Sequence, residues 1–146
     1  MQREIITTAD GSKTIQIKDW NEQYHSKHGA IQEAYHVFIK HGLDLFHNKE
    51  EVVHILEIGF GTGLNALITL LETSISGMVV EYCGVEAYPV SEEELSQLNY
   101  IEELNAQEFS GQFKKMHAAP WEERTLLSQG FSILKMQRDF KEIALE

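Results

Sequence analysis

The sequence predicts an α/β fold whose core is a doubly wound, mostly parallel β-sheet, preceded by an N-terminal β-hairpin. Two observations predict the sheet: an apolar run at residues 52–58 that is followed by closely spaced glycines, and a second apolar run at residues 79–86 that ends in an acid. A chain of 146 residues with 42% hydrophobic content can bury one core. We therefore expect a single domain over residues 1–146, with the hairpin in residues 1–22 and the sheet core in residues 50–146.

The hairpin is predicted from two short β-branched runs, residues 5–8 and 13–17. Asp10-Gly11 lies between them, and Asp-Gly is a strong signal for a tight turn between antiparallel strands. The alternating Ile15 and Ile17 should face the core.

Residues 19–29 are polar and aromatic and predict a loop, in which Trp20 and Tyr24 either cover the core or touch a ligand. Residues 30–46 predict one amphipathic helix. Its expected apolar stripe is Ile31, Tyr35, Phe38, Gly42 and Leu45.

The strongest local pattern is V-V-H-I-L-E-I-G-F-G-T-G-L-N, which spans residues 52–65. Its first seven residues predict a buried strand. Gly59, Gly61 and Gly63 then predict a tight turn, because glycine tolerates positive φ and lets a ligand approach the backbone. Residues 64–71 predict a helix whose N-terminal N–H groups are unpaired.

The glycine spacing favours one kind of cofactor. The dinucleotide fingerprint G-x-G-x-x-G would need a third glycine at position 64, which is Leu64. The observed E-x-G-x-G-x-G, beginning at Glu57, is the pattern of S-adenosylmethionine-dependent methyltransferases with a Rossmann-like fold. The alternative is a purely structural glycine turn in another α/β protein.

A second strand is predicted over residues 79–86 and ends in Glu86, which lies 86 − 63 = 23 positions after Gly63. An acid at this place accepts hydrogen bonds from the ribose hydroxyls in nucleotide-binding folds of this type. The alternative is a solvent-exposed glutamate. Tyr88 follows and could pack against an adenine ring.

The remaining chain predicts a capping box at Ser91 and Glu94, a helix to residue 104, a helical piece over residues 109–116 and a strand over residues 131–137. Asp139, just beyond that strand, is either an acceptor for the adenine amino group or part of a solvated turn. Three strands form only the first half of a doubly wound sheet, so we expect the domain to be C-terminally incomplete.

Composition excludes several classes of protein. No apolar run is long enough to cross a bilayer and no charged leader precedes one, so we expect a cytoplasmic protein with no membrane partner. A lone cysteine, Cys83, excludes a disulfide framework and a cysteine-ligated metal. Glu33 and His36 share a helix face, but the sequence shows no further ligands. We predict no metal site, and surface or loop positions for most of the histidines, a group to which His25 belongs.

Twelve Lys and Arg against 23 Asp and Glu give 12 − 23 = −11. A chain this acidic is a poor general binder of nucleic acid, because cationic side chains supply most non-specific affinity.

Two blocks resemble one family closely, the bacterial methyltransferases that complete 5-methylaminomethyl-2-thiouridine at the tRNA wobble position (the MnmC/MnmD type). The first is Y-H-S-K-H-G-A-I-Q-E-A-Y-H-V-F at residues 24–38, and the second is E-I-G-F-G-T-G-L-N at residues 57–65. The likeness runs from about residue 24 to residue 140, without the flavin-dependent oxidase domain fused to some members.

The resemblance implies a Rossmann-like fold, S-adenosylmethionine as cofactor and methylation of the aminomethyl nitrogen of the modified uridine, with tRNA as the substrate. By the same resemblance and the glycine motif, the cofactor site should include Tyr24, Ser26, Glu33, Glu57, Gly59, Gly61, Gly63, Asn65, Glu86 and Asp139. No catalytic base is assigned. Two alternatives remain: a small-molecule methyltransferase, favoured by the net charge, and a non-catalytic cofactor-binding fragment. A homodimer through an exposed sheet edge is possible.

Overall fold

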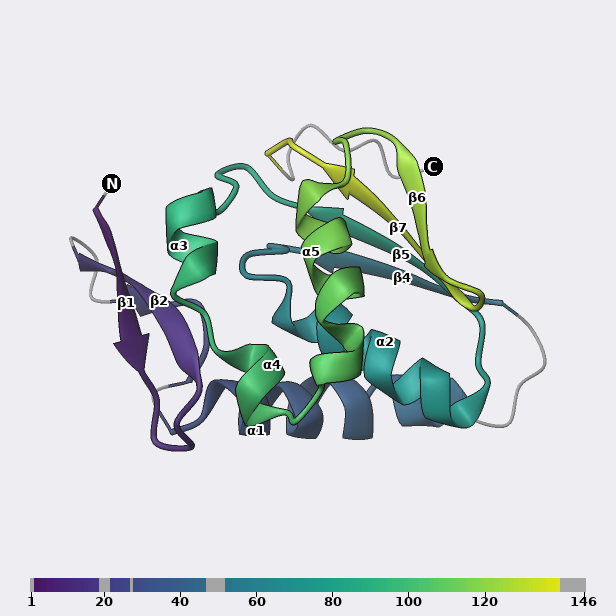
Figure 1. Cartoon of the computed structure of the whole chain (residues 1–146), viewed down its shortest axis with the longest axis horizontal. Helices are drawn as coiled ribbons and strands as arrows, with labels where there is room; N and C mark the ends of the chain where they lie inside the picture. Colours follow the sequence, from purple (N-terminus) through teal and green to yellow (C-terminus); the bar gives the residue numbers. More distant parts are fainter. Residues whose placement is uncertain (1, 19–21, 27, 47–51, 140–146) are drawn as a thin grey trace.

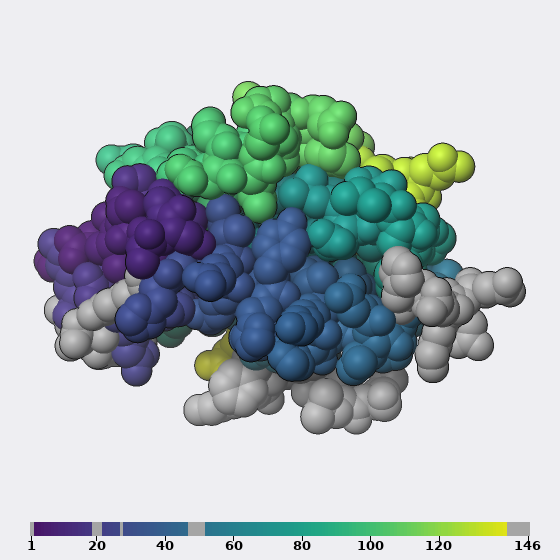
Figure 2. Space-filling view, turned by 90° about the horizontal axis from the view of Figure 1, so that it is seen from below, coloured from purple at the N-terminus to yellow at the C-terminus, as the bar shows by residue number. Residues whose placement is uncertain are grey.

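The computed structural model describes residues 2–18, 22–26, 28–46 and 52–139. A small antiparallel sheet lies at one end of the molecule and a larger sheet at the other, with helices between and beneath them (Figure 1). Viewed from below, the small N-terminal sheet lies against the helical segment that begins at Ala30, and α2 (Leu64–Ser76) lies on the other side of that segment (Figure 2).

The N-terminal sheet contains the predicted hairpin, β1 (Arg3–Thr7) and β2 (Lys13–Ile17), which pair antiparallel. Gly11 lies in the turn with φ +87°, a conformation that favours glycine. The Asp10 carboxylate accepts from the backbone N–H of Ser12 and of Gln32, both at 3.0 Å, and so ties the turn to the next helix. A third strand, β3 (Glu22–Gln23), pairs with β2 and was not predicted.

The predicted helix over residues 30–46 is helical but changes its winding twice. It consists of α1 (Ala30–Glu33), the π-helix η2 (Ala34–Lys40) and the 3₁₀-helix η3 (Leu43–Phe46). Because π-helical hydrogen bonds skip one residue more than α-helical ones, the buried positions shift around the axis. The prediction that Leu45 is buried was wrong, since its side chain is 69% exposed, and Leu43 is buried instead. Trp20 lies outside the described residues.

The larger sheet has the order β4-β5-β7-β6. β4 (Val53–Ile58), β5 (Val80–Val85) and β7 (Phe131–Met136) are parallel neighbours, which confirms the three predicted strands. β6 (Arg124–Ser128) runs antiparallel to β7 and was not predicted, so the sheet is mixed rather than wholly parallel.

The connection between β5 and β7 begins at the predicted capping box, in which Ser91 and Glu94 satisfy each other's backbone N–H groups. The helix predicted to continue to residue 104 is instead broken in two. The helical elements of this connection are α3 (Glu92–Ser96), α4 (Tyr100–Glu103), η4 (Gln107–Phe109) and α5 (Ser110–Ala118).

The hydrophobic core lies on one face of the larger sheet. Tyr82 and Ile133 of that face are fully buried with residues of α2, η2 and α5. On the opposite face of β4, Leu56 and Ile58 are 51% and 52% exposed. The prediction of a strand buried on both faces was therefore wrong for β4, whose side chains alternate between core and solvent.

Successive right-handed crossovers from β4 to β5 to β7 advance in one direction, which places their helices on the same face. The second helical layer of a doubly wound sheet is not seen among the described residues and stays a prediction. In that part of the chain β4 is an edge strand. No described helix is long and apolar enough to cross a membrane.

Candidate cofactor-binding site

A cavity of about 380 Å³ opens at the carboxyl ends of β4 and β5. Its size falls within the range of roughly 300–1,000 Å³ that is usual for small-molecule sites, and strand ends are where open α/β sheets bind ligands. Its lining comes from the segment after β4, the segment after β5, the N-terminal sheet and η2: Ile17, Tyr24, His25, Glu33, Ala34, Val37, Phe38, Glu57, Gly59, Phe60, Gly61, Thr62, Asn65, Glu86 and Tyr88.

The glycine loop gives the cavity a wall of bare backbone. Gly59 and Gly61 have φ of +86° and +56°, which disfavours any residue with a Cβ. A Cβ on Gly59 would meet no atom within 4 Å, so this backbone is open to a ligand. A Cβ on Gly61 would lie 3.0 Å from the Tyr24 ring, so this glycine lets the ring pack closely on the loop.

Glu86 stands just beyond β5 and supports the glycine loop. One carboxylate oxygen accepts from the backbone N–H of Gly61 at 2.7 Å, and the other accepts from that of Tyr88 at 3.2 Å. Each oxygen has a second lone pair, so the carboxylate can also accept from a ligand. Its place beside the glycine loop is the one predicted for a ribose-binding acid.

Glu57 lies at the bottom of the cavity, with 8% of its surface exposed. It accepts from Asn65 Nδ2 at 2.7 Å and from the Tyr82 hydroxyl at 2.8 Å. Burial raises the pKa of Glu57 to about 7, against the opposing effect of these two hydrogen bonds and with a smaller contribution from the charge of Glu86. The carboxyl group is thus poised to change its charge near neutral pH.

The N-terminal side of the cavity is formed by residues far from the glycine loop in sequence. Glu33, the last residue of α1, accepts from the backbone N–H of Ser26 at 2.6 Å. His25 is half-buried and bonds Thr14 Oγ1 through Nδ1 at 2.7 Å. Burial lowers the pKa of His25 to about 4, so it is neutral at physiological pH. His25 thus lies in a loop, but it is half-buried and not a surface residue.

A second histidine braces the glycine loop from behind. His117 Nε2 lies 2.8 Å from the Thr62 carbonyl oxygen and donates to it. Burial lowers the pKa of His117 to about 4, a larger effect than the hydrogen bond to Thr62, which raises it. The Tyr100 hydroxyl bonds Thr62 Oγ1 at 3.1 Å. A Cβ on Gly63 would lie 2.9 Å from His117 Nε2, so Gly63 serves packing behind the loop.

Seven of the ten residues predicted for the site line the cavity: Tyr24, Glu33, Glu57, Gly59, Gly61, Asn65 and Glu86. Three do not. Gly63 lies behind the loop, and Ser26 lines a neighbouring depression together with Glu33. Asp139 is exposed beyond β7 and is not among the lining residues. Whether any of the ten contacts a cofactor stays a prediction.

Several lining residues were not predicted for the site. Val37 and Phe38 face the cavity from η2, and Phe60 and Thr62 come from the variable positions of the glycine motif. Phe60 and Thr62 belong to the F-G-T-G block quoted above, so a closer reading of that block could have found them. Val37 and Phe38 end the other quoted block, residues 24–38, so the same applies to them.

The charge of the lining is one-sided. Glu33, Glu57 and Glu86 contribute carboxyl groups, and no described lining residue is a lysine or an arginine. Such a lining suits hydroxyl donors and positive charge, and it suits a pyrophosphate poorly. Among the described residues, no group of three or more His, Cys, Asp or Glu side chains could hold a metal ion.

The known proteins that this chain resembles in sequence share one name. A scan for family models found no match. The chain is 35% identical over 95 residues, 60% of its length, to the tRNA 5-methylaminomethyl-2-thiouridine biosynthesis bifunctional protein MnmC of Leptospira interrogans. It is 32% identical over 126 residues, 80% of its length, to the protein of the same name from Idiomarina loihiensis. The aligned segment covers 14% and 21% of these relatives.

The fold agrees with a solved structure, MnmC2 from Aquifex aeolicus. The two match with a TM-score of 0.72 and 27% sequence identity, over 98% of this chain and 46% of the Aquifex chain. The likeness therefore extends over both sheets described above. Sequence and fold together show that this chain is homologous to the MnmC proteins and shares the architecture of MnmC2.

Proposed function

We propose that this chain binds S-adenosylmethionine and acts as a methyltransferase on the aminomethyl group of 5-aminomethyl-2-thiouridine in tRNA. The observation that carries the proposal is the acidic cavity at the ends of β4 and β5, where open glycine backbone faces three carboxyl groups. The homology to proteins named for biosynthesis of this modified nucleoside supplies the substrate.

The lining residues fit the parts of S-adenosylmethionine. Glu86 has free acceptor capacity for two adjacent ribose hydroxyls. The backbone at Gly59 admits the ligand without a clash. Glu57 and Glu33 offer negative charge to a cofactor that carries a sulfonium and an ammonium group. The exposed Tyr88 and the apolar Val37 provide surfaces on which an adenine ring can pack.

When bound, S-adenosylmethionine supplies an electrophilic methyl group on a positively charged sulfur. Held by Glu86, Glu57 and Glu33, the cofactor would supply this methyl group to the amine nitrogen, leaving S-adenosylhomocysteine and releasing one proton from the amine. The protein's contribution is to hold the methyl group and the neutral amine close and in line. We assign no described residue as the base, because none is shown to reach the amine.

One observation favours a second candidate, a small-molecule methyltransferase. The net charge of −11 opposes binding to a polyanion, and a small substrate would avoid that repulsion. Location in the cytoplasm and dimerisation through the β4 edge are further proposals that the activity does not depend on.

The test is a calorimetric titration with S-adenosylmethionine, followed by transfer of labelled methyl groups. The acceptors are tRNA carrying 5-aminomethyl-2-thiouridine, the same tRNA without the modification, and a metabolite extract. We expect saturable binding with Kd roughly in the micromolar range, about −8 kcal/mol, and label only in the modified tRNA. Label in the metabolite extract would favour the second candidate. Absence of binding by the folded protein would contradict both.

A further inference from the structure

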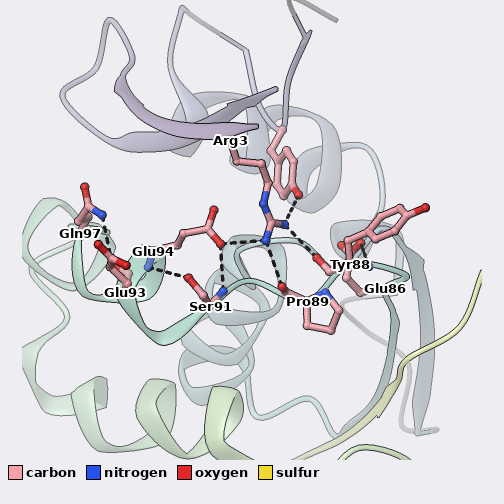
Figure 3. A network of polar contacts seen from close by, with 9 residues as sticks. Arg3, Glu86, Tyr88, Pro89, Ser91, Glu93, Glu94 and Gln97 are labelled. Carbon is pink, nitrogen blue, oxygen red and sulfur yellow. Dashed lines mark hydrogen bonds and ion pairs between the residues drawn. The ribbon is translucent and has the colours of Figure 1, made fainter. Parts of the chain in front are cut away.

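One arginine joins three parts of the chain at the edge of the cavity. Arg3 begins β1, and its side chain is 16% exposed. Its guanidinium donates to four acceptors: the Tyr24 hydroxyl at 3.0 Å, the Tyr88 carbonyl at 3.0 Å, the Pro89 carbonyl at 3.3 Å and Glu94 Oε1 at 2.9 Å. Figure 3 shows this network, with Arg3 reaching across to the loop after β5 and to the start of α3.

The acceptors belong to segments that are remote in sequence. Tyr24 follows β3 in the N-terminal sheet, whereas Tyr88 and Pro89 follow β5, and Glu94 lies in the first turn of α3. The Glu94 oxygen that receives Arg3 also accepts from the Ser91 backbone N–H at 3.0 Å, so Arg3 is bonded directly to the capping box. Arg3 thereby links the N-terminal sheet to the loop that carries Glu86.

Both tyrosines in this network, Tyr24 and Tyr88, line the cavity. The Tyr24 ring packs on Gly61, and its hydroxyl receives the Arg3 bond. Tyr88 is 62% exposed, so little packing holds it. Its position depends on its backbone, which donates to Glu86 and accepts from Arg3. Arg3 is not one of the lining residues, but it bonds to two of them, Tyr24 on the N-terminal side of the cavity and Tyr88 in the loop after β5.

The chemistry of the network requires a guanidinium. Its planar fork presents five donors, enough to serve two carbonyls, a carboxylate and a hydroxyl at once. A lysine would keep the charge near Glu94 but has a single ammonium group, which cannot span these four acceptors.

We propose that Arg3 is a positioning residue for cofactor binding: it locks the N-terminal sheet to the loop after β5 and so holds Tyr24, Tyr88 and Glu86 in the arrangement that receives the ligand. This inference rests on the proposed function, because it takes the cavity to be the S-adenosylmethionine site. It assigns the N-terminal sheet a role in ligand binding.

The test compares Arg3→Gln and Arg3→Lys with the control Lys18→Gln. Lys18 follows β2 and pairs at 3.3 Å with Glu4 on the same sheet, and it is not itself one of the lining residues. Amide hydrogen exchange of residues 86–90 is measured without ligand, and the Kd for S-adenosylmethionine is measured by titration at a temperature where all variants are folded.

We expect Arg3→Gln to speed exchange in residues 86–90 selectively and to weaken S-adenosylmethionine binding by about tenfold or more, as for loss of a charged hydrogen bond. Arg3→Lys should fall between Arg3→Gln and the wild type in both measurements, and Lys18→Gln should stay within about twofold of the wild type. In the transfer assay, Arg3→Lys should raise KM for S-adenosylmethionine more than it lowers kcat.

Three results would overturn the proposal: unchanged exchange at residues 86–90 in a folded Arg3→Gln protein, an increase spread over the whole chain, or unchanged affinity despite faster local exchange. If Arg3→Gln does not fold, the same criteria apply to Arg3→Lys. If wild-type protein binds no S-adenosylmethionine, the proposed function fails, and the exchange measurement separately decides whether Arg3 locks the loop.

Discussion

The cavity has two walls that are built in different ways. The glycine-loop wall consists of Glu57, Gly59–Thr62 and Asn65 together with Glu86 and Tyr88, which lie at or just after the ends of two adjacent parallel strands. The N-terminal wall consists of Ile17, Tyr24, His25, Glu33, Ala34, Val37 and Phe38, which come from the small sheet and from helices α1 and η2. The first wall follows from local strand–turn–helix geometry, whereas the second depends on how remote elements pack.

This difference has a consequence for binding. In the glycine-loop wall, the groups that face the ligand are the loop backbone and the carboxyl groups of Glu57 and Glu86, which are hydrogen-bonded to Asn65 and to the Gly61 N–H. In the N-terminal wall, a single side chain, Arg3, bonds Tyr24 to the loop after β5. Substitutions in the glycine-loop wall should remove contacts with the ligand. Substitutions that break the Arg3 link should instead leave the ligand-binding residues less firmly positioned.

The largest effect is expected from Glu86→Ala. This substitution removes the acceptor proposed for two ribose hydroxyls and leaves the Gly61 N–H without its partner. Charged hydrogen bonds contribute about 1.5–3 kcal/mol each, so S-adenosylmethionine affinity should fall about 100-fold or more in a calorimetric titration. The matched control is Glu81→Ala, because Glu81 lies on the same strand but pairs with His54 at the surface. Equal affinities in the two variants would exclude Glu86 from the site.

The effect expected from Glu57→Gln is on stability and not on affinity, and it depends on pH. The pKa of Glu57 is raised to about 7 in the folded protein, above its ordinary value of 4.5, chiefly by burial. The folded state therefore binds this proton more tightly than the unfolded state does. The stability that the proton supplies is complete below about pH 4.5 and is lost as the pH rises through about 7.

The Gln variant should lack this loss. Relative to wild type its free energy of unfolding should gain with pH, by up to roughly 3 kcal/mol between pH 4.5 and pH 8. The oxygen of the new amide can still accept from Asn65, and the Tyr82 hydroxyl can accept from the amide N–H, but the hydroxyl hydrogen then loses its carboxylate acceptor, a cost that does not change with pH in this range. Denaturant unfolding at several pH values measures the difference. A difference that does not change with pH would show that Glu57 titrates normally.

The smallest effect on affinity is expected from the Arg3 substitutions described above, because Arg3 touches the ligand-binding residues and not the ligand. A loss as large as that of Glu86→Ala would mean that the N-terminal wall is not secondary to the glycine-loop wall.

The two walls also differ in how far they could be predicted. Glu57, Gly59, Gly61 and Glu86 follow from strand ends and from spacing, and they line the cavity, whereas Gly63 lies behind the loop. Tyr24 and Glu33 were expected only through resemblance to a family. The Arg3 network was not predicted, because it joins segments tens of residues apart. The π-helix and the burial of His25 were not predicted either.

The sheet shows a similar limit. An apolar run predicted β4 but could not show that Leu56 and Ile58 are exposed, because strand hydrophobicity does not reveal which layers cover a strand. β6 was missed because its five residues, R-T-L-L-S, mix polar and apolar side chains without strict alternation. The sequence pattern thus predicted β4 and β5, which end at the site, but not β6, which completes the sheet.

The central claim is that both walls bind the same cofactor. Amide hydrogen exchange with and without saturating S-adenosylmethionine tests it directly. We expect slower exchange in residues 57–65 and 86–89 and also in residues 24–26 and 33–38, with little change in β6. Protection confined to residues 57–65 and 86–89 would contradict the account, because the N-terminal wall would then take no part in the site.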